Sequence, residues 1–438
     1  MQTIEQLLSG ELKGSKILKL SCDLYTFPKE IFDLADTLEI LDLSHNNLSQ
    51  LPPNFCDLKK LKIAFFSDND FTEFPEVLSK CPNLTMIGFK ANKISHIPEL
   101  AFPPNLQWLI LTDNCIEHLP KNIGKCSQLQ KLAIAGNNLK ELPQELVNCK
   151  KLELLRISAN QILQFPEWLF NLPRLSWLAY SSNPCSQTTQ TTNHLPNISW
   201  HELTIQEQLG EGASGIISKA LWNNNSTSKH VAVKIFKGDV TSDGFAEDEI
   251  KVCKATGNHK NLVKVLGQIQ AHPKEKLGLV LELIPTSFKN LGNPPSFDTC
   301  TRDTFKLGTN FSSDTIFTIA QSIADAAKHL HAKGIMHGDL YAHNTLIDED
   351  INTIFGDFGA STAYDVFNKN AYSLERLEVR AFGCLLEDLL NHVTTKNGDA
   401  DLKCALIHLK EKCMNEQILE RPNFTEICEY IKSISLAN

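Results

Sequence analysis

Apolar residues recur through the first part of the chain with a period of 22 to 23 residues. Alternation at Leu41, Asp42 and Leu43 predicts a short strand whose leucines face a core and whose intervening side chains face the other side. One copy of the unit contains Leu38, Leu41, Leu43, Asn46, Leu48, Leu51 and Pro52, and the next contains Leu61, Ala64, Phe66, Asn69, Phe71, Phe74 and Pro75. The pattern predicts a stack of similar strand-and-turn units.

An asparagine follows the strand in each full copy, at Asn46 and Asn69 in the two copies above and at Asn92, Asn114, Asn137 and Asn160 in the later ones. At a turn, its amide can satisfy backbone groups that would otherwise be buried without partners. A worn copy near 17–28 and a truncated one over 175–184 are atypical, as the caps of such a stack must be. The pattern resembles the leucine-rich-repeat family over about residues 15–185. The resemblance implies a curved parallel sheet that binds partners on its inner face.

Several inner-face positions carry large apolar side chains, namely Phe65, Trp108, Ile110 and Trp177. Trp108 and Trp177 occupy the same position in their copies, six residues before the asparagine. Exposed aromatic residues on a rigid platform are typical anchors for a protein partner, so we expect these four residues to bind one. For Trp177 an alternative has equal weight, which is packing against the rest of the protein.

From residue 205 the pattern changes to apolar strands followed by amphipathic helices. Gly210, Gly212 and Gly215 lie between two strands, and Ile217 lies at the start of the second. Glycines let backbone amides approach the phosphates of a nucleotide. Further on, a strand holds Ala232 and Lys234, and a buried lysine needs an opposite charge. Glu249, on the next predicted helix, is the candidate partner.

The segments 335–346 and 355–359 contain HGD, an asparagine five residues after the aspartate, and DFG. With the glycine loop and VAVK, these resemble the motifs of protein kinases in their order and spacing. The resemblance implies that Asp339 orients the substrate hydroxyl and accepts its proton, that Lys234 assists catalysis, and that Asn344 and Asp357 bind Mg²⁺. The residues it implies for ATP binding are Gly210, Gly212, Gly215, Ile217, Ala232, Lys234, Glu249, Glu282, Ile284 and Leu346.

Together these patterns predict an α/β leucine-rich-repeat solenoid over residues 1–184, a linker over 185–199, and an α+β bilobal protein-kinase-like fold. Its N-lobe is expected over 200–284 and its C-lobe over 285–438. The net charge of −9 gives no general attraction to nucleic acid. No apolar stretch is long enough to span a membrane, and no signal peptide is apparent. Thirteen scattered cysteines suit a reducing compartment, so a cytoplasmic protein is expected.

Three features depart from the usual kinase pattern. Gly338 stands where many kinases have an arginine that pairs with a phosphorylated activation loop, and Tyr341 stands where Ser/Thr kinases have a lysine. The activation segment is short, with eighteen residues between Gly359 and Glu378, and lacks the APE motif. An insertion over 293–311 has no assigned role; a surface loop is the simplest interpretation, and a lining of the substrate cleft is the alternative.

The leading hypothesis is therefore a signalling protein kinase that uses ATP and Mg²⁺, with serine or threonine as the first candidate acceptor and tyrosine as the second. Its repeats would bind a protein ligand, and its other partner would be a protein substrate. Two alternatives stay open. The departures motivate a pseudokinase scaffold, and the HGD motif with its asparagine also occurs in kinases of small molecules such as aminoglycosides.

Overall fold

The computed structural model describes residues 2–186, 195–212, 214–224, 227–238, 241, 243–394 and 400–437. Much of the predicted linker, residues 187–194, lies outside this range. The chain forms two compact units. Unit 1 comprises Met1–Leu175 and Asn183–Cys185, and unit 2 comprises Ser176–Ser182 and Ser186–Asn438. The short segment Ser176–Ser182, which contains the strand of the truncated repeat, therefore groups with the second unit.

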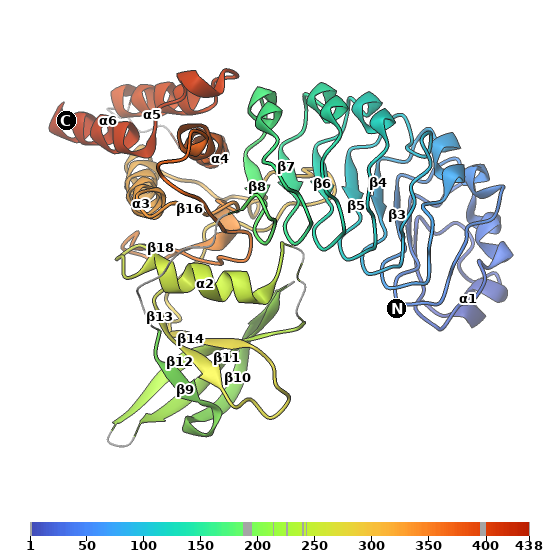
Figure 1. The fold of residues 1–438 in the computed structure, drawn as a ribbon, viewed down its shortest axis with the longest axis horizontal. Coiled ribbons are helices and arrows are strands. Elements are labelled where there is room, and N and C mark those ends of the chain that lie inside the picture. The colour runs from blue at the N-terminus through green and yellow to red at the C-terminus, as the bar shows by residue number, and fades with distance from the viewer. Residues whose placement is uncertain are drawn as a thin grey trace. The chain divides into compact units, whose positions relative to one another are not determined.

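Unit 1 is the repeat array, confirming the predicted solenoid, and Figure 1 shows the strands of consecutive copies side by side. Adjacent strands pair in parallel, for example with Leu41 opposite Ala64. The helix α1 (Ile4–Leu8) precedes the first strand, and its N-terminus is capped by Thr3 and Gln6. The strands are β1 (Ile17–Lys19), β2 (Ile40–Asp42), β3 (Ile63–Phe65), β4 (Met86–Gly88), β5 (Trp108–Ile110), β6 (Lys131–Ala133) and β7 (Leu154–Arg156). Short 3-10 helices return the chain at Lys29–Leu34, Phe55–Asp57, Glu76–Lys80, Lys121–Lys125, Gln144–Asn148 and Glu167–Asn171.

A ladder of buried asparagines joins successive copies, as the sequence predicts. The side-chain oxygen of Asn137 accepts from the backbone N–H of Ile116 (3.0 Å), and its amide nitrogen donates to the carbonyl oxygens of Leu111 (2.9 Å) and Ile134 (3.1 Å). Asn114 repeats the arrangement one copy earlier. Each asparagine thus satisfies backbone groups of its own copy and of the preceding one.

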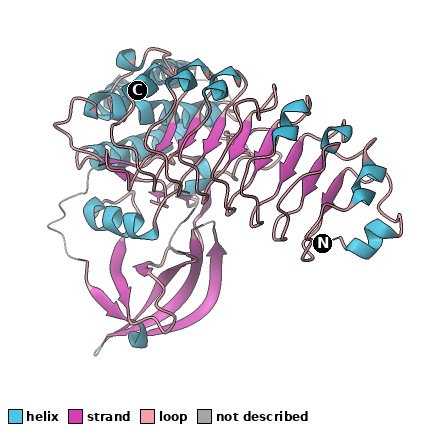
Figure 2. Cartoon of the chain, turned by 45° about the vertical axis from the view of Figure 1, so that its right-hand side comes forward, coloured by secondary structure: helices cyan, strands magenta, loops and turns pink. Residues whose placement is uncertain are grey.

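Unit 2 contains a strand-rich lobe and a helical lobe, which is the predicted bilobal arrangement (Figure 2). The N-lobe has a six-stranded sheet in the order β10-β11-β12-β14-β13-β9. Val231, Val233 and Val280 lie in its core. Its elements are β9 (Asn197–Ser199), a 3-10 helix at Trp200–Glu202, β10 (Leu203–Glu211), β11 (Gly215–Asn224), β12 (Thr227–Phe236), α2 (Ala246–Thr256), β13 (Val265–Gln270) and β14 (Gly278–Glu282). Because β9 pairs with β13, residues 197–199 of the predicted linker are part of this sheet.

The helical lobe is built on α3 (Ser313–His331) and α4 (Ala371–Leu390). Ser312 caps α3 by accepting from the backbone N–H of Thr315 (3.1 Å). The buried apolar residues of α3 follow helical spacing, at Ile316, Ile319 and Ile323. The other elements are β15 (Lys289–Asn290), β16 (Ile335–Met336), β17 (Thr345–Ile347), β18 (Thr353–Phe355), β19 (Thr362–Ala363), α5 (Ala400–Cys413), α6 (Phe424–Ala437), and 3-10 helices at Ala342–Asn344 and Ile418–Glu420. Among the described residues, no helix is long and apolar enough to cross a bilayer.

Candidate active site

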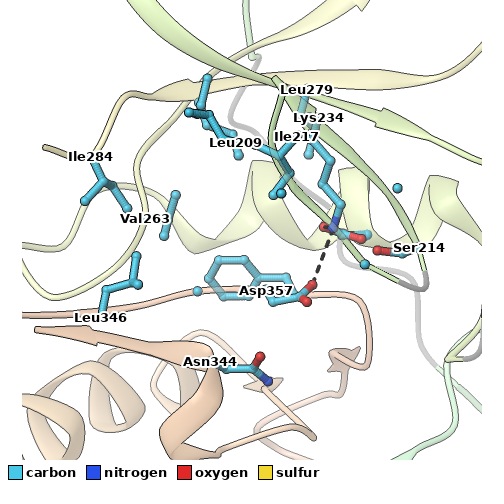
Figure 3. A pocket seen from close by; sticks show the side chains of 18 of the residues that line it. Leu209, Ser214, Ile217, Lys234, Val263, Leu279, Ile284, Asn344, Leu346 and Asp357 are labelled. Carbon is cyan, nitrogen blue, oxygen red and sulfur yellow. Dashed lines mark hydrogen bonds and ion pairs between the residues drawn. The ribbon is translucent and has the colours of Figure 1, made fainter. Parts of the chain in front are cut away.

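A cavity of about 500 Å³ opens in unit 2, within the range of nucleotide-sized pockets. Apolar side chains from the N-lobe strands, such as Leu209 and Leu279, form one wall, and Leu346 of β17 faces them (Figure 3). Every residue expected from the sequence to bind ATP lines it: Gly210, Gly212, Gly215, Ile217, Ala232, Lys234, Glu249, Glu282, Ile284 and Leu346. Asn344 and Asp357 line it too, so residues scattered over the sequence converge on one space.

The glycine loop joins β10 to β11 at the edge of the cavity. A Cβ on Gly215 would lie 2.6 Å from the carbonyl oxygen of Ile235, so the packing of β12 requires a glycine there. A Cβ on Gly210 or Gly212 would meet no atom within 4 Å. The space beside these two glycines is therefore open for close approach of a ligand to the backbone.

Lys234 projects from β12 and meets two carboxylates. Its Nζ lies 2.6 Å from Oε1 of Glu249, on α2, and 3.4 Å from Oδ1 of Asp357 (Figure 3). Burial alone would lower the pKa of Lys234, but the charges of Asp357 and Glu249 raise it above its ordinary value. Lys234 therefore stays cationic. Burial acts in the opposite sense on Asp357, yet the charge of Lys234 lowers the pKa of that carboxyl and keeps it ionised.

The catalytic-loop motif lies between β16 and β17. The side-chain nitrogen of Asn344 donates to Oδ2 of Asp339 (2.8 Å) and to its carbonyl oxygen (3.0 Å). These bonds fix the orientation of the Asn344 amide and tie it to Asp339. Asp339 itself is half-buried and is not among the residues that line the cavity.

Glu378 of α4 binds the backbone of the catalytic loop through hydrogen bonds. Its carboxylate accepts from the backbone N–H groups of His337 (3.0 Å) and Gly338 (2.6 Å), and from the ring nitrogen Nε2 of His331 (2.7 Å). Burial would raise the pKa of Glu378, but the hydrogen bond from His331 and neighbouring charges lower it. The buried, ionised carboxylate therefore orders the residues just before Asp339.

The insertion over 293–311 is not a simple surface loop, because four of its residues, Cys300, Thr301, Asp303 and Phe311, are buried. Asp303 accepts from the backbone N–H of His343 (3.0 Å) and contacts its ring nitrogen Nδ1 (2.6 Å). Arg302 binds Asp388 and Glu387 of α4 at 2.6 and 2.8 Å. The insertion thus connects the catalytic loop to α4, and no local sequence motif could have revealed this.

The four residues predicted to bind a partner have two different environments. Phe65, Trp108 and Ile110 are partly exposed on the strands β3 and β5 of unit 1. Lys131 places its Nζ 4.1 Å from the centroid of the Trp108 ring, in a cation–π contact. Trp177 is only 1 % exposed and stacks on Tyr341 inside unit 2. The structure therefore favours the packing alternative for Trp177 over a role as a surface anchor.

The geometry defines a kinase-type domain joined to a repeat array. Residues 203–400 match the family model of protein tyrosine and serine/threonine kinases. Residues 37–58, 82–139 and 127–184 match models of leucine-rich repeats. The chain therefore contains leucine-rich repeats and a protein kinase domain.

The curated relatives include proteins named as serine/threonine-protein kinases and as tyrosine-protein kinases. A probable serine/threonine-protein kinase of Dictyostelium discoideum is 27% identical over 53% of this chain and 28% of its own length. A probable LIM domain-containing serine/threonine-protein kinase of the same organism is 27% identical over 52% of this chain and 26% of its own length. Fibroblast growth factor receptor 1 of Dugesia japonica is 30% identical over 37% of this chain and 19% of its own length. The chain thus spans less than a third of each of these relatives.

Proposed function

We propose that this protein is an ATP-dependent protein kinase that phosphorylates serine or threonine, with tyrosine as the second candidate acceptor. The observation that carries the proposal is the cluster of Lys234, Glu249 and Asp357 at one end of a nucleotide-sized cavity. Phosphoryl transfer needs positioning and charge neutralisation more than covalent chemistry, and this cluster supplies both. The buried Glu249 holds the cationic Lys234 where it can bind the phosphates of ATP.

The donor set at the cavity also suits Mg²⁺. Asn344 and Asp357 offer an amide oxygen and a carboxylate, and magnesium prefers oxygen ligands, of which water and phosphate supply the rest. The described residues contain no group of three or more His, Cys, Asp or Glu arranged to hold a metal by themselves, which is consistent with a metal held jointly by protein and nucleotide. When bound, Mg²⁺ neutralises charge on the phosphates. Asn344 keeps its amide nitrogen on Asp339, so its amide oxygen is the group directed to the metal.

Asp339 is the proposed general base of the reaction. Its carboxylate would orient the acceptor hydroxyl and take up its proton as the oxygen bonds to the γ-phosphorus of ATP, the bond from that phosphorus to the bridging oxygen breaks, and ADP leaves. Asn344 holds one oxygen of that carboxylate, and Glu378 fixes the backbone of the two preceding residues. The base is therefore positioned before substrate binds, which lowers the cost of reaching the reactive geometry.

The test is transfer of labelled γ-phosphate from Mg·ATP to generic protein substrates or to the protein itself. The Asp339→Asn variant should bind Mg·ATP like the native protein but lose transfer, and exposed Leu163→Ala is the matched variant that should keep both. Identification of the phosphorylated residue decides between the acceptor classes. Binding of Mg·ATP without transfer would instead favour a scaffold, and transfer to an aminoglycoside but to no protein would favour a small-molecule kinase.

We propose further that the repeats bind a protein ligand through Phe65, Trp108 and Ile110. The ring of Phe65 lies over Gly88 of the neighbouring strand, whose missing side chain leaves it room. This forms an apolar patch next to the Trp108–Lys131 pair. Trp108→Ala should lose co-purifying partners while exposed His96→Ala keeps them. If a folded Trp108→Ala protein retains them all, this surface is not the binding site.

We also place the protein in the cytoplasm. None of the thirteen cysteines forms a disulfide, and eight are buried, including Cys81, Cys126 and Cys149 in the repeat cores. Burial raises the pKa of Cys126 to about 11, which leaves its thiol neutral and unreactive. Buried thiols that form no disulfides fit a reducing compartment. The measurement is fractionation of cells that express the tagged protein, and recovery with membranes or in the medium would contradict the placement.

A further inference from the structure

The segment Ser176–Ser182 has contacts that neither the repeat pattern nor the kinase motifs explain. It contains β8 (Trp177–Ala179) and belongs to unit 2, although the chain on either side of it belongs to unit 1. Within unit 2 it contacts the catalytic loop, the activation segment and two helices. These contacts, taken one at a time, point to a role in catalysis.

Trp177 is in direct contact with the two residues that follow Asp339. Its indole N–H donates to the carbonyl oxygen of Leu340 (3.1 Å). Its ring stacks on Tyr341 with centroids 4.4 Å apart and planes only 7° from parallel. An aromatic pair of this kind adds roughly 0.5–1.5 kcal/mol beyond the burial of its surface. Tyr341, at the position of the usual lysine of Ser/Thr kinases, is therefore a packing residue in this protein.

Tyr341 has further partners besides Trp177. Its ring lies 4.9 Å from that of His343, and His343 is paired with the buried Asp303. The carbonyl oxygen of Tyr341 accepts from the hydroxyl of Thr345 (2.9 Å). The loop that bears Asp339 is thus held both by Trp177 and, through His343, by the insertion.

Gly338 explains why no arginine precedes Asp339 here. Its φ of +74° favours glycine, and a Cβ would lie 2.7 Å from the carbonyl oxygen of Leu178 and 2.6 Å from that of Ala360. The backbone of β8 and the activation segment occupy the space that a side chain needs. The loss of the arginine and the close approach of this segment are therefore one structural feature.

The part of the activation segment that precedes α4 has no accessible phosphorylation site. Between Gly359 and α4 its hydroxyl-bearing residues are Ser361, Thr362 and Tyr364, and all three are buried. The hydroxyl of Thr362 accepts from the backbone N–H of Tyr180 (3.1 Å), and that of Ser361 donates to the carbonyl oxygen of His337 (3.0 Å).

The segment also reaches one helix of each lobe. The hydroxyl of Ser182 donates to the carboxylate of Asp248, the residue before Glu249 on α2. Arg380 of α4, which is buried, donates to the hydroxyl of Ser176 (2.6 Å). Seven consecutive residues thus contact α2, the catalytic loop, the activation segment and α4.

We propose that Ser176–Ser182 is a built-in positioning element for phosphoryl transfer, with Trp177 as its main positioning residue. It holds the catalytic loop and the activation segment in place through packing and hydrogen bonds, so that no phosphorylation of the activation segment is needed. This inference rests on the proposed kinase activity. It adds that the order of the site depends on a segment about 160 residues before the catalytic loop.

The test compares the full-length native protein with Trp177→Ala, Trp177→Phe and exposed Leu163→Ala. Trp177→Ala should lower kcat on the order of 10- to 100-fold, because the base is no longer held in place, while the Kd for Mg·ATP stays native. Trp177→Phe keeps a ring on Tyr341 but loses the N–H donor, so its kcat should lie between that of the native protein and that of Trp177→Ala. Because Trp177 acts through Tyr341, the Tyr341→Ala change should have little further effect in the Trp177→Ala background.

Hydrogen exchange of residues 337–344 gives a readout that does not require activity. Exchange there should be faster in Trp177→Ala than in Leu163→Ala, with the N-lobe strands unchanged. Native kcat and native exchange in Trp177→Ala would overturn the proposal. If Trp177→Ala does not fold, Trp177→Phe with native kcat and exchange would overturn it. A native protein that transfers no phosphate contradicts the proposed function instead, and the exchange result then decides the positioning role alone.

Phosphatase treatment tests the second half of the proposal. The treated native protein should keep its full kcat, and mass spectrometry of the active protein should find residues 360–377, which include the half-exposed Tyr372, unmodified. Loss of activity on treatment, together with phosphate on any hydroxyl-bearing residue of this range, would contradict it.

Discussion

His343 is the residue through which pH should act on the catalytic loop. Burial lowers its pKa, but the hydrogen bond and charge of Asp303, with smaller contributions from Asp339 and Asp357, raise it above the ordinary value. Folding therefore favours the protonated ring. The stabilisation is complete below the unfolded-state pKa of about 6.5 and is lost as pH rises through the folded-state pKa.

We therefore predict that His343→Gln lowers the free energy of unfolding more at pH 6 than at pH 9. Loss of the partner of the buried Asp303 should cost about 1–3 kcal/mol at the lower pH. Urea unfolding of native and variant protein across this range measures the difference. A difference that is constant between pH 6 and pH 9 would show that folding does not raise the pKa of His343. The exposed His45→Gln is the matched control.

Gly338 should tolerate no side chain. Gly338→Ala would introduce both backbone strain at φ +74° and a Cβ that contacts two carbonyl oxygens at 2.6 and 2.7 Å. Gly308 has a similar φ of +84° in the same unit, but a Cβ there meets nothing within 4 Å. We expect Gly308→Ala to cost about 1 kcal/mol from strain alone, and Gly338→Ala to cost about 1–3 kcal/mol more.

Thermal unfolding of the two glycine variants measures these costs in parallel. Because the clash lies beside Asp339, Gly338→Ala should also lose phosphate transfer, whereas Gly308→Ala should keep it. Equal destabilisation by the two substitutions would mean that the loop adjusts easily, and that the close approach of Leu178 does not determine the choice of glycine.

At the scale of elements, the asparagine ladder should determine the stability of the repeats. Asn137→Ala removes four hydrogen bonds and leaves backbone groups of Ile116 and Leu111 buried without that partner. We expect a loss of about 2–4 kcal/mol. The neighbouring Asn138 is exposed, so Asn138→Ala should change stability by less than about 0.5 kcal/mol. Denaturant unfolding of both variants tests this, and similar effects would contradict the assigned role of the ladder.

Elements that depend on local spacing could be predicted from the sequence. The 22- to 23-residue period and its asparagines identify the repeats. The glycine loop, VAVK, the catalytic-loop motif and DFG identify residues that converge on the cavity. This is possible because each motif positions its side chains within a single turn or strand. Two contacts of the catalytic loop could not be found this way. Trp177 with Tyr341, and Asp303 with His343, join distant segments that share no periodicity. The repeat pattern places Trp177 on the inner face of the array, where binding a partner and packing inside the protein are equally plausible. Only the contact with Tyr341 in the folded protein decides for packing.

At the scale of the whole molecule, the grouping of Ser176–Ser182 with unit 2 predicts how nucleotide binding spreads through the chain. A ligand that binds only the folded state stabilises the cooperative unit that contains its site, by about 2.7 kcal/mol at a concentration 100 times Kd. The amide of Tyr180 donates to Thr362 of the activation segment, whereas the amide of Asn138 donates to Ile116 within the repeats. Mg·ATP should therefore slow hydrogen exchange at Tyr180 together with residues 337–344, and leave Asn138 unchanged.

Protection of the catalytic loop without protection of Tyr180 would show that the segment opens independently of the site. In the Asp357→Asn variant, which lacks one proposed metal ligand, the protection of both should weaken together, because the segment responds to the site and not to ATP elsewhere on the protein.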